Sequence, residues 1–159
     1  MSTDPIAIDW DARGRLWVLE MGDYPLGTDG KLKAGGRVKR LDDTDGDGLP
    51  DTAVPFMEDI AFPTGLLCWQ DGVFVCSAPD ILFARDTDGD GRADDIRKRY
   101  TGWPTHNFNA RVNSLGLGLD GWIHGSGGLF GGTIEPGGAD TSASAASPAA
   151  TAWPASEFR

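Results

Sequence analysis

Short apolar segments recur along the chain, and each follows a glycine that ends a polar turn. The three glycines are Gly14, Gly72 and Gly121, and another apolar segment precedes each turn. Asp-Gly dipeptides at 71–72 and 120–121 are typical of hairpin turns, because these turns need a positive φ that Asp tolerates and Gly favours. The pattern therefore predicts three β-hairpins.

Two further strands are predicted after each of the first two hairpins. The third strands lie at 37–41 and 81–85, and the fourth strands lie at 54–57 and 96–100. Four strands in succession, followed by a new unit, are the organisation of a propeller blade. We expect two complete four-stranded blades and the opening hairpin of a third.

Composition indicates an all-β chain that is too short for a closed ring. The sequence has 23 glycines, 10 prolines and 6 tryptophans, and it shows no long window with apolar positions at helical spacing. A closed propeller has about four to eight blades, more than 159 residues supply. We expect an all-β, partial β-propeller of about two and a half blades that is a fragment of a longer protein.

The two ends of the chain differ from its middle. Residues 1–132 carry the blade pattern, whereas residues 133–159 are rich in Ala, Ser, Gly and Pro and offer little to bury. We expect the second segment to be a disordered tail. We recognise no signal peptide and no apolar run of about 18 residues, so we expect no transmembrane span.

One nine-residue motif, Asp-Thr-Asp-Gly-Asp-Gly-x-x-Asp, occurs at 43–51 and again at 86–94. Alternate carboxylates and a glycine that lets the backbone curve around an ion suit a hard, oxygen-liganded cation. An EF-hand has a bidentate Glu at the twelfth position, where this chain has Val54 or Arg97, so we predict calcium loops that are not EF-hands and that stiffen the blades. The predicted ligands are the side chains of Asp43, Asp45, Asp47 and Asp51 with the carbonyl of Leu49, and the side chains of Asp86, Asp88, Asp90 and Asp94 with the carbonyl of Arg92.

The two motifs account for the charge of the chain. The net charge is −10, and segments 42–51 and 86–95 each contain five acidic residues. Repulsion among these residues destabilises a metal-free form, and an acidic surface argues against a nucleic acid partner. The alternative is that the loops are only solvated acidic turns, which would need neither the alternation nor the glycine.

The two cysteines, Cys68 and Cys76, flank the turn at 71–72. Pairing across a two-residue turn places Cys68 opposite Val75 and the two thiols on opposite faces of the hairpin. We therefore expect free thiols. The chain has no Cys-x-x-Cys-His motif, so we expect no haem site within it.

Several short sequence motifs, in the order in which they occur along the chain, resemble those of a known family. These motifs are residues 36–38, 43–48, 62–66, 71–75, 78–79, 111–115 and 118–125. Over Pro5 to Gly132 the chain thereby resembles part of the propeller of the membrane-bound dehydrogenases of planctomycetes and verrucomicrobia, which are similar to soluble quinoprotein glucose and sorbosone dehydrogenases.

The resemblance implies a ring of about six or seven blades. It also implies export to the periplasm or cell exterior, and oxidation of a small carbohydrate or alcohol by pyrroloquinoline quinone. The implied partners are the remainder of the propeller and a cytochrome c domain. Such an oxidation needs a histidine base to take the hydroxyl proton, and Ala110 stands where the family has that histidine.

Three residues are candidates for the implied site. His106 is the nearest candidate for the base, and the alternative is an ordinary histidine on a surface loop. Arg111 and Asn113 match the Arg-Val-Asn motif of the family and are candidate cofactor ligands. A purely structural role in the local strand and turn would explain these two residues equally well.

Two classes of function stay open. The first is a fragment of a quinoprotein-like sugar or alcohol dehydrogenase with two calcium loops, inactive alone. The second is a calcium-stabilised propeller without catalysis that binds a glycan or a protein partner. The missing histidine favours the second class for this chain taken alone.

Overall fold

All of the described secondary structure consists of β-strands and turns. The computed structural model of the protein describes residues 3–138 and 150–154, which form strands and no helix. The all-β prediction is confirmed, and no helix in the described part could cross a membrane. The strands are β1 (Pro5–Trp10), β2 (Leu16–Met21), β3 (Gly36–Asp42), β4 (Thr52–Ile60), β5 (Gly65–Trp69), β6 (Gly72–Ser77), β7 (Asp80–Arg85), β8 (Asp95–Thr101), β9 (Asn113–Leu117), β10 (Trp122–Ser126), β11 (Glu135–Pro136) and β12 (Ala150–Pro154).

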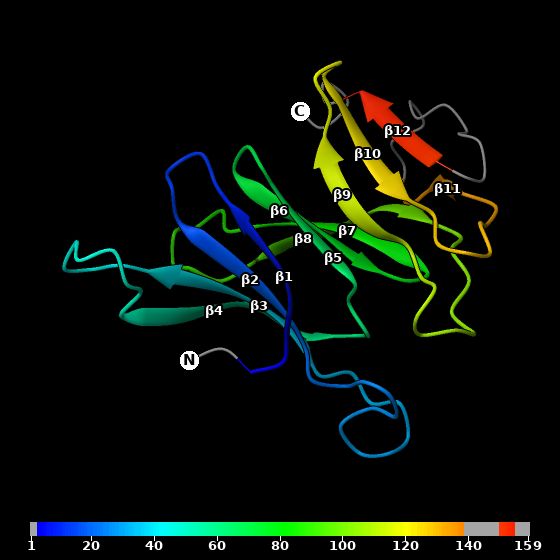
Figure 1. The fold of residues 1–159 in the computed structure, drawn as a ribbon, viewed down its shortest axis with the longest axis horizontal. Helices are drawn as coiled ribbons and strands as arrows, with labels where there is room; N and C mark the ends of the chain where they lie inside the picture. The colour runs from blue at the N-terminus through cyan, green and yellow to red at the C-terminus, as the bar shows by residue number, and fades with distance from the viewer. Residues whose placement is uncertain (1–2, 139–149, 155–159) are drawn as a thin grey trace.

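These strands build three antiparallel sheets, which lie next to one another in Figure 1. The first sheet has the order β1-β2-β3-β4, the second the order β11-β8-β7-β6-β5, and the third the order β12-β10-β9. Strand β1 contacts β5, and β5 contacts β9, so the first strands of consecutive sheets are neighbours. Consecutive propeller blades have this arrangement, and the described residues do not close it into a ring.

The predicted units match the observed sheets. The first two sheets are the two predicted four-stranded blades, and β9 and β10 are the predicted third hairpin. Of the predicted tail, 133–159, the structure describes two strands: β11 pairs with β8, and β12 pairs with β10. Most of the remaining tail lies outside the described residues, and the domain boundary at residue 132 stays a prediction.

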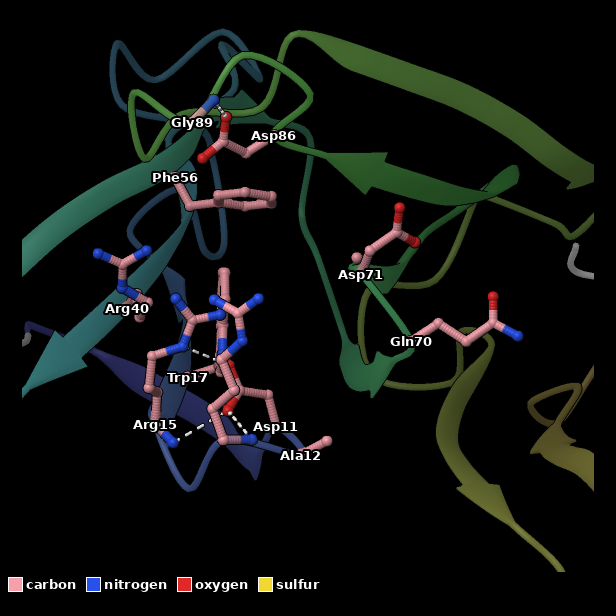
Figure 2. A pocket seen from close by; sticks show the side chains of 12 residues that line it. Asp11, Ala12, Arg15, Trp17, Arg40, Phe56, Gln70, Asp71, Asp86 and Gly89 are labelled. Carbon is pink, nitrogen blue, oxygen red and sulfur yellow. Dashed lines mark hydrogen bonds and ion pairs between the residues drawn. The ribbon is translucent and has the colours of Figure 1, made fainter.

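Two apolar clusters hold the sheets together. Between the first and second sheets, Leu19 and Val73 are fully buried, and the ring of Trp17 meets that of Phe56 edge-on with centroids 4.8 Å apart (Figure 2). Phe74, the next residue along β6, belongs to the second cluster, between the second and third sheets. The second sheet is therefore apolar on both faces, because successive side chains of a strand point to opposite sides.

Antiparallel pairing sorts the connections between strands into two groups at opposite ends of the sheets. The acidic-loop end, as we call it, carries the hairpin turns and both acidic loops, which are residues 11–15, 43–51, 70–71, 86–94 and 118–121. The opposite end carries residues 22–35, 61–64, 78–79 and 102–112. The acidic motifs and the candidate catalytic residues are thus at different ends of the molecule.

The turn of the β5–β6 hairpin lies one residue earlier than predicted. The structure pairs Cys68 with Val73, and not with the predicted partner two residues further on. Gln70 adopts the positive φ of the turn, 51°. Gly72 lies inside the strand instead, because a Cβ at this position would come within 2.5 Å of the backbone oxygen of Ala84. The close approach of β7, and not the turn, requires this glycine.

Both cysteines are free thiols on opposite faces of the hairpin, as predicted. Cys68 packs against the cluster between the first and second sheets, whereas Cys76 belongs to the cluster between the second and third. Burial raises the pKa of both thiols, so both are protonated at neutral pH.

We expect Leu19→Ala to lower the free energy of unfolding by about 2–5 kcal/mol, because it opens a cavity between the first two sheets. Ile8→Ala is the matched control, since Ile8 is in the same sheet but 61% exposed, and its effect should stay within about 0.5 kcal/mol. Urea unfolding followed by tryptophan fluorescence measures both variants. Equal losses in the two variants would contradict the described packing.

Candidate functional site

The first acidic loop, residues 43–51, connects β3 to β4 and is held together by its own backbone. The two carboxylate oxygens of Asp43 accept hydrogen bonds from the N–H groups of Gly46, at 2.7 Å, and Gly48, at 2.8 Å. Both glycines have a positive φ, 79° and 91°, which other residues rarely adopt. The loop therefore folds around the side chain of its first aspartate.

The second acidic loop, residues 86–94, repeats this geometry between β7 and β8. Asp86 accepts hydrogen bonds from the N–H groups of Gly89, at 2.6 Å, and Gly91, at 2.9 Å, and both glycines again have a positive φ. Burial raises the pKa of Asp86, but the two N–H donors and a hydrogen bond with the side chain of Asp88 lower it, and the net shift of the pKa is downward. The same network in two separate segments indicates that the motif itself determines the loop geometry.

The middle aspartates of each loop follow the same rule. Asp45 Oδ1 accepts from the N–H of Asp47 at 3.2 Å, and Asp47 Oδ1 accepts from the N–H of Leu49 at 2.7 Å. In the second loop, Asp88 and Asp90 accept in turn from the N–H groups two residues further on, at 3.1 and 2.7 Å. A carboxylate can accept several hydrogen bonds, so these aspartates keep lone pairs for a cation.

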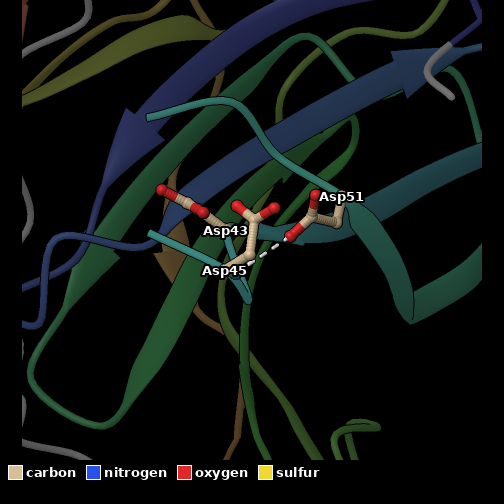
Figure 3. Close-up of side chains that lie close together, drawn as sticks. All are labelled: Asp43, Asp45 and Asp51. Atoms are coloured by element: carbon tan, nitrogen blue, oxygen red, sulfur yellow. Dashed lines mark hydrogen bonds between the residues drawn. The ribbon is translucent and has the colours of Figure 1, made fainter. Parts of the chain in front are cut away.

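Each loop gathers three of its four predicted carboxylate ligands. Oxygens of the three lie within 4.8 Å of one another in each group. Two oxygens that bind the same Ca²⁺ at about 2.3–2.6 Å can be at most about 5 Å apart, so both groups fit one ion. The groups are Asp43, Asp45 and Asp51 in the first loop (Figure 3), and Asp86, Asp88 and Asp90 in the second.

The fourth predicted carboxylate differs between the loops: Asp47 is outside the first group, and Asp94 is outside the second. The two loops are therefore similar but not identical in the absence of an ion. The carbonyl groups of Leu49 and Arg92 stay predicted ligands.

A threonine at the second position of each motif orients the last aspartate, a role that the sequence analysis did not assign. Thr44 donates its backbone N–H and its hydroxyl to Asp51 Oδ2, both at 2.6 Å. Thr87 donates likewise to Asp94, at 2.9 and 2.6 Å. These hydrogen bonds lower the pKa of both carboxyls. The repetition of threonine in the two motifs was the available signal.

The second loop also joins the first sheet to the second. The N–H of Ala93 donates to the carbonyl of Phe56 in β4 at 2.8 Å, and Arg92 pairs with Glu58 of the same strand at 3.1 Å. A Cβ added to Gly91 would lie 3.2 Å from Val54 Cγ1, so the loop rests directly on β4. The position of this loop is thus coupled to the packing of two sheets.

A buried pair of opposite charges occupies the opposite end of the sheets. Asp23 is fully buried, and its Oδ2 accepts from the N–H groups of Gly35, at 3.2 Å, and Phe62, at 2.7 Å. Arg111 is 5% exposed and lies over the ring of Phe62, and one of its terminal nitrogens donates to the carbonyl of Thr105 at 2.8 Å. Burial lowers the pKa of Arg111, and the charge of Asp23 opposes this shift.

The three candidate catalytic and cofactor-binding residues lie at this same end of the sheets and differ in their partners. Arg111 has a buried Nε without a hydrogen-bond partner in the described structure, so it retains a donor for an anion. Asn113 already donates to the carbonyl of Arg111 at 3.1 Å and accepts from Ser114 at 2.8 Å. His106 is exposed and packs on Phe130. Arg111 thus offers one donor that fits an anionic group of a quinone cofactor, and the catalytic and cofactor-binding roles of the three residues stay predictions.

We expect Thr44→Val to raise the pKa of Asp51 in metal-free protein, because it removes the hydroxyl donor. A carboxyl with a depressed folded-state pKa stabilises the fold above its ordinary pKa, and this contribution disappears as the pH falls through the folded-state value. The variant should therefore lose stability at neutral pH and match the wild type in strong acid. Carboxyl ¹³C titration and urea unfolding across pH measure both effects.

Thr52→Val, at an exposed position just after the loop, is the control for this experiment. It should leave the pKa of Asp51 unchanged. An equal pKa shift in the two variants would contradict the role assigned to Thr44.

Two solved structures share the fold of this chain: the calcium structure and the iodide structure of Trichoderma reesei Carbohydrate-Active Enzymes Family AA12. Each matches 78% of this chain with a TM-score of 0.52 and 20% sequence identity, and this likeness concerns the fold alone. The chain spans 29% and 30% of their lengths. No curated protein matches the chain. A family model described as a domain of unknown function (DUF7133) matches residues 1–154, and the chain belongs to that family.

Proposed function

We propose that this chain is a set of calcium-stabilised propeller blades and that each acidic loop binds one Ca²⁺. Calcium prefers six to eight oxygen ligands, and each loop offers carboxylates, a backbone carbonyl and space for water. The ion offsets the repulsion among the acidic side chains of the loop. It stiffens the connection between the third and fourth strands of a blade.

The geometry shared by the two loops is the observation that carries this proposal. Both loops curve through two glycines of positive φ around the first aspartate, and both bring three carboxylates within reach of one ion. A solvated acidic turn would be free to spread its charges apart. The likeness to a fold determined in a calcium structure adds independent support.

We further propose that the blades belong to a quinoprotein-like dehydrogenase that oxidises a small carbohydrate or alcohol in the periplasm or outside the cell. Further blades and a cytochrome c domain would complete it. Pyrroloquinoline quinone would supply the redox chemistry, and Arg111 would supply one donor to an anionic group of the cofactor. The order of the sequence motifs and the likeness to carbohydrate-active enzymes support this reading.

A second candidate is a binding module without catalysis, which takes a glycan or a protein partner. The local partners of the candidate residues favour it for this chain alone: His106 is on the surface and packs on Phe130, and the amide of Asn113 already has local partners. In that case the calcium loops act only on the stability of the blades.

Calcium titration tests the first proposal. We expect isothermal calorimetry to detect two sites, and we expect Asp45→Ala and Asp88→Ala to remove one site each. Calcium should raise the melting temperature by mass action. The loss of this stabilisation should be larger in Asp88→Ala, because the second loop contacts two sheets.

Glu135→Ala is the matched control, because it removes an exposed carboxylate outside the loops. It should keep both sites and the full calcium response. A melting temperature that is the same in calcium and in chelator would refute the metal assignment.

Dye reduction separates the two function classes. We expect this chain with calcium and pyrroloquinoline quinone to reduce no dye in the presence of aldoses or alcohols, because it lacks an assembled base. A longer protein that includes further blades should reduce the dye under the same conditions. Sustained dye reduction by this chain that is lost in His106→Ala would overturn the expectation that the chain is inactive alone. If the longer protein also reduces no dye, the dehydrogenase proposal is refuted and the binding module is the remaining candidate.

A further inference from the structure

A cavity of about 280 Å³ lies between the first and second sheets at the acidic-loop end. Figure 2 shows Arg15 and Trp17 on one side of it, Gln70 and Asp71 on the other, and Asp86 of the second acidic loop at its end. Its size suits a ligand no larger than a monosaccharide.

Three arginines line the cavity and retain hydrogen-bond donors. Among the described residues, the guanidinium of Arg15 uses only its Nε, which donates to Asp11 at 2.6 Å. Arg40 uses its Nε and one terminal nitrogen for Asp42, so its other terminal nitrogen has no partner among the described residues. The guanidinium of Arg13, on an exposed turn, has none within the same residues.

The carboxylates that line the cavity are already occupied. Asp11 accepts four hydrogen bonds, from two backbone N–H groups, from Arg15 Nε and from the indole of Trp17. Asp86 accepts from two glycine N–H groups of its own loop, and Asp71 pairs with Arg85 at 3.3 Å. The cavity therefore offers a guest mainly donors, which favours an anionic guest.

We propose that this cavity binds a small carboxylate anion with a hydroxylated body, of the size of a sugar acid. Planar guanidinium groups bind carboxylates in a bidentate manner, with strong, directional hydrogen bonds. Trp17 and Phe56 form the apolar part of the lining, and Gln70 adds an amide that can meet hydroxyl groups. The arginines lie outside the acidic motifs, whereas Asp86 and Gly89 of the second acidic loop form part of the lining.

The test compares two ligands that differ in one group. Glucuronate and glucose share a ring, but only glucuronate carries a carboxylate. We expect calorimetry to detect saturable binding of glucuronate, which weakens as salt is raised, and no binding of glucose. Inorganic phosphate should compete if the arginines recognise oxyanions in general, whereas binding of phosphate without binding of glucuronate would overturn the proposal.

Variants locate the site. Arg13→Gln and Arg40→Gln should each weaken glucuronate binding by about tenfold, as expected for the loss of a hydrogen bond to a charged group. Arg97→Gln, which removes an exposed guanidinium from outside the cavity, should bind as the wild type does. Thermal melts show whether each variant is folded.

Each unfavourable result has a definite meaning. Equal affinity for glucose and glucuronate, no saturable binding at millimolar concentrations, or unchanged binding in both cavity variants would overturn the proposal. Titrations in calcium and in chelator keep the two proposals apart. If glucuronate binds but calcium does not, only the metal assignment is refuted. If calcium binds but glucuronate does not, only the proposed anion site is refuted.

Discussion

Each sheet buries an apolar face against the next sheet, and this packing determines where every loop of the molecule lies. Val73 and Phe74 point to opposite clusters, so β6 must be held between two neighbours. Once the sheets are side by side, antiparallel pairing places alternate connections at opposite ends: both acidic loops share one end, and the connections 22–35 and 102–112 share the other. The positions of the acidic loops, of the cavity and of the buried Asp23 and Arg111 are consequences of this sorting.

The strands and the acidic loops follow from local features of the sequence. The nine-residue motifs coincide with the connections β3–β4 and β7–β8, because the glycines and aspartates act within the loop itself. Three of the four predicted carboxylates in each loop come together for the same reason. Turn chemistry also predicted each hairpin, although it misplaced the β5–β6 turn because the glycine at 72 is needed for packing against β7.

The features that sequence reasoning missed depend on segments far apart in the chain. Asp23, Phe62 and Arg111 belong to three different connections, and only the assembled sheets bring them together. Nothing near Asp23 in the sequence indicates that its carboxylate will be fully buried and receive the N–H of residue 62. The cavity between Arg15 and Asp71 is equally non-local, since the two sheets contribute its opposite walls.

The hydrogen bond from Ala93 to the carbonyl of Phe56 crosses from one sheet to its neighbour. A change in the order of the second loop is therefore transmitted to β4, in the preceding blade. In a repeat array, contacts of this kind and the buried interfaces couple each unit to its nearest neighbours. We therefore expect adjacent blades to unfold cooperatively.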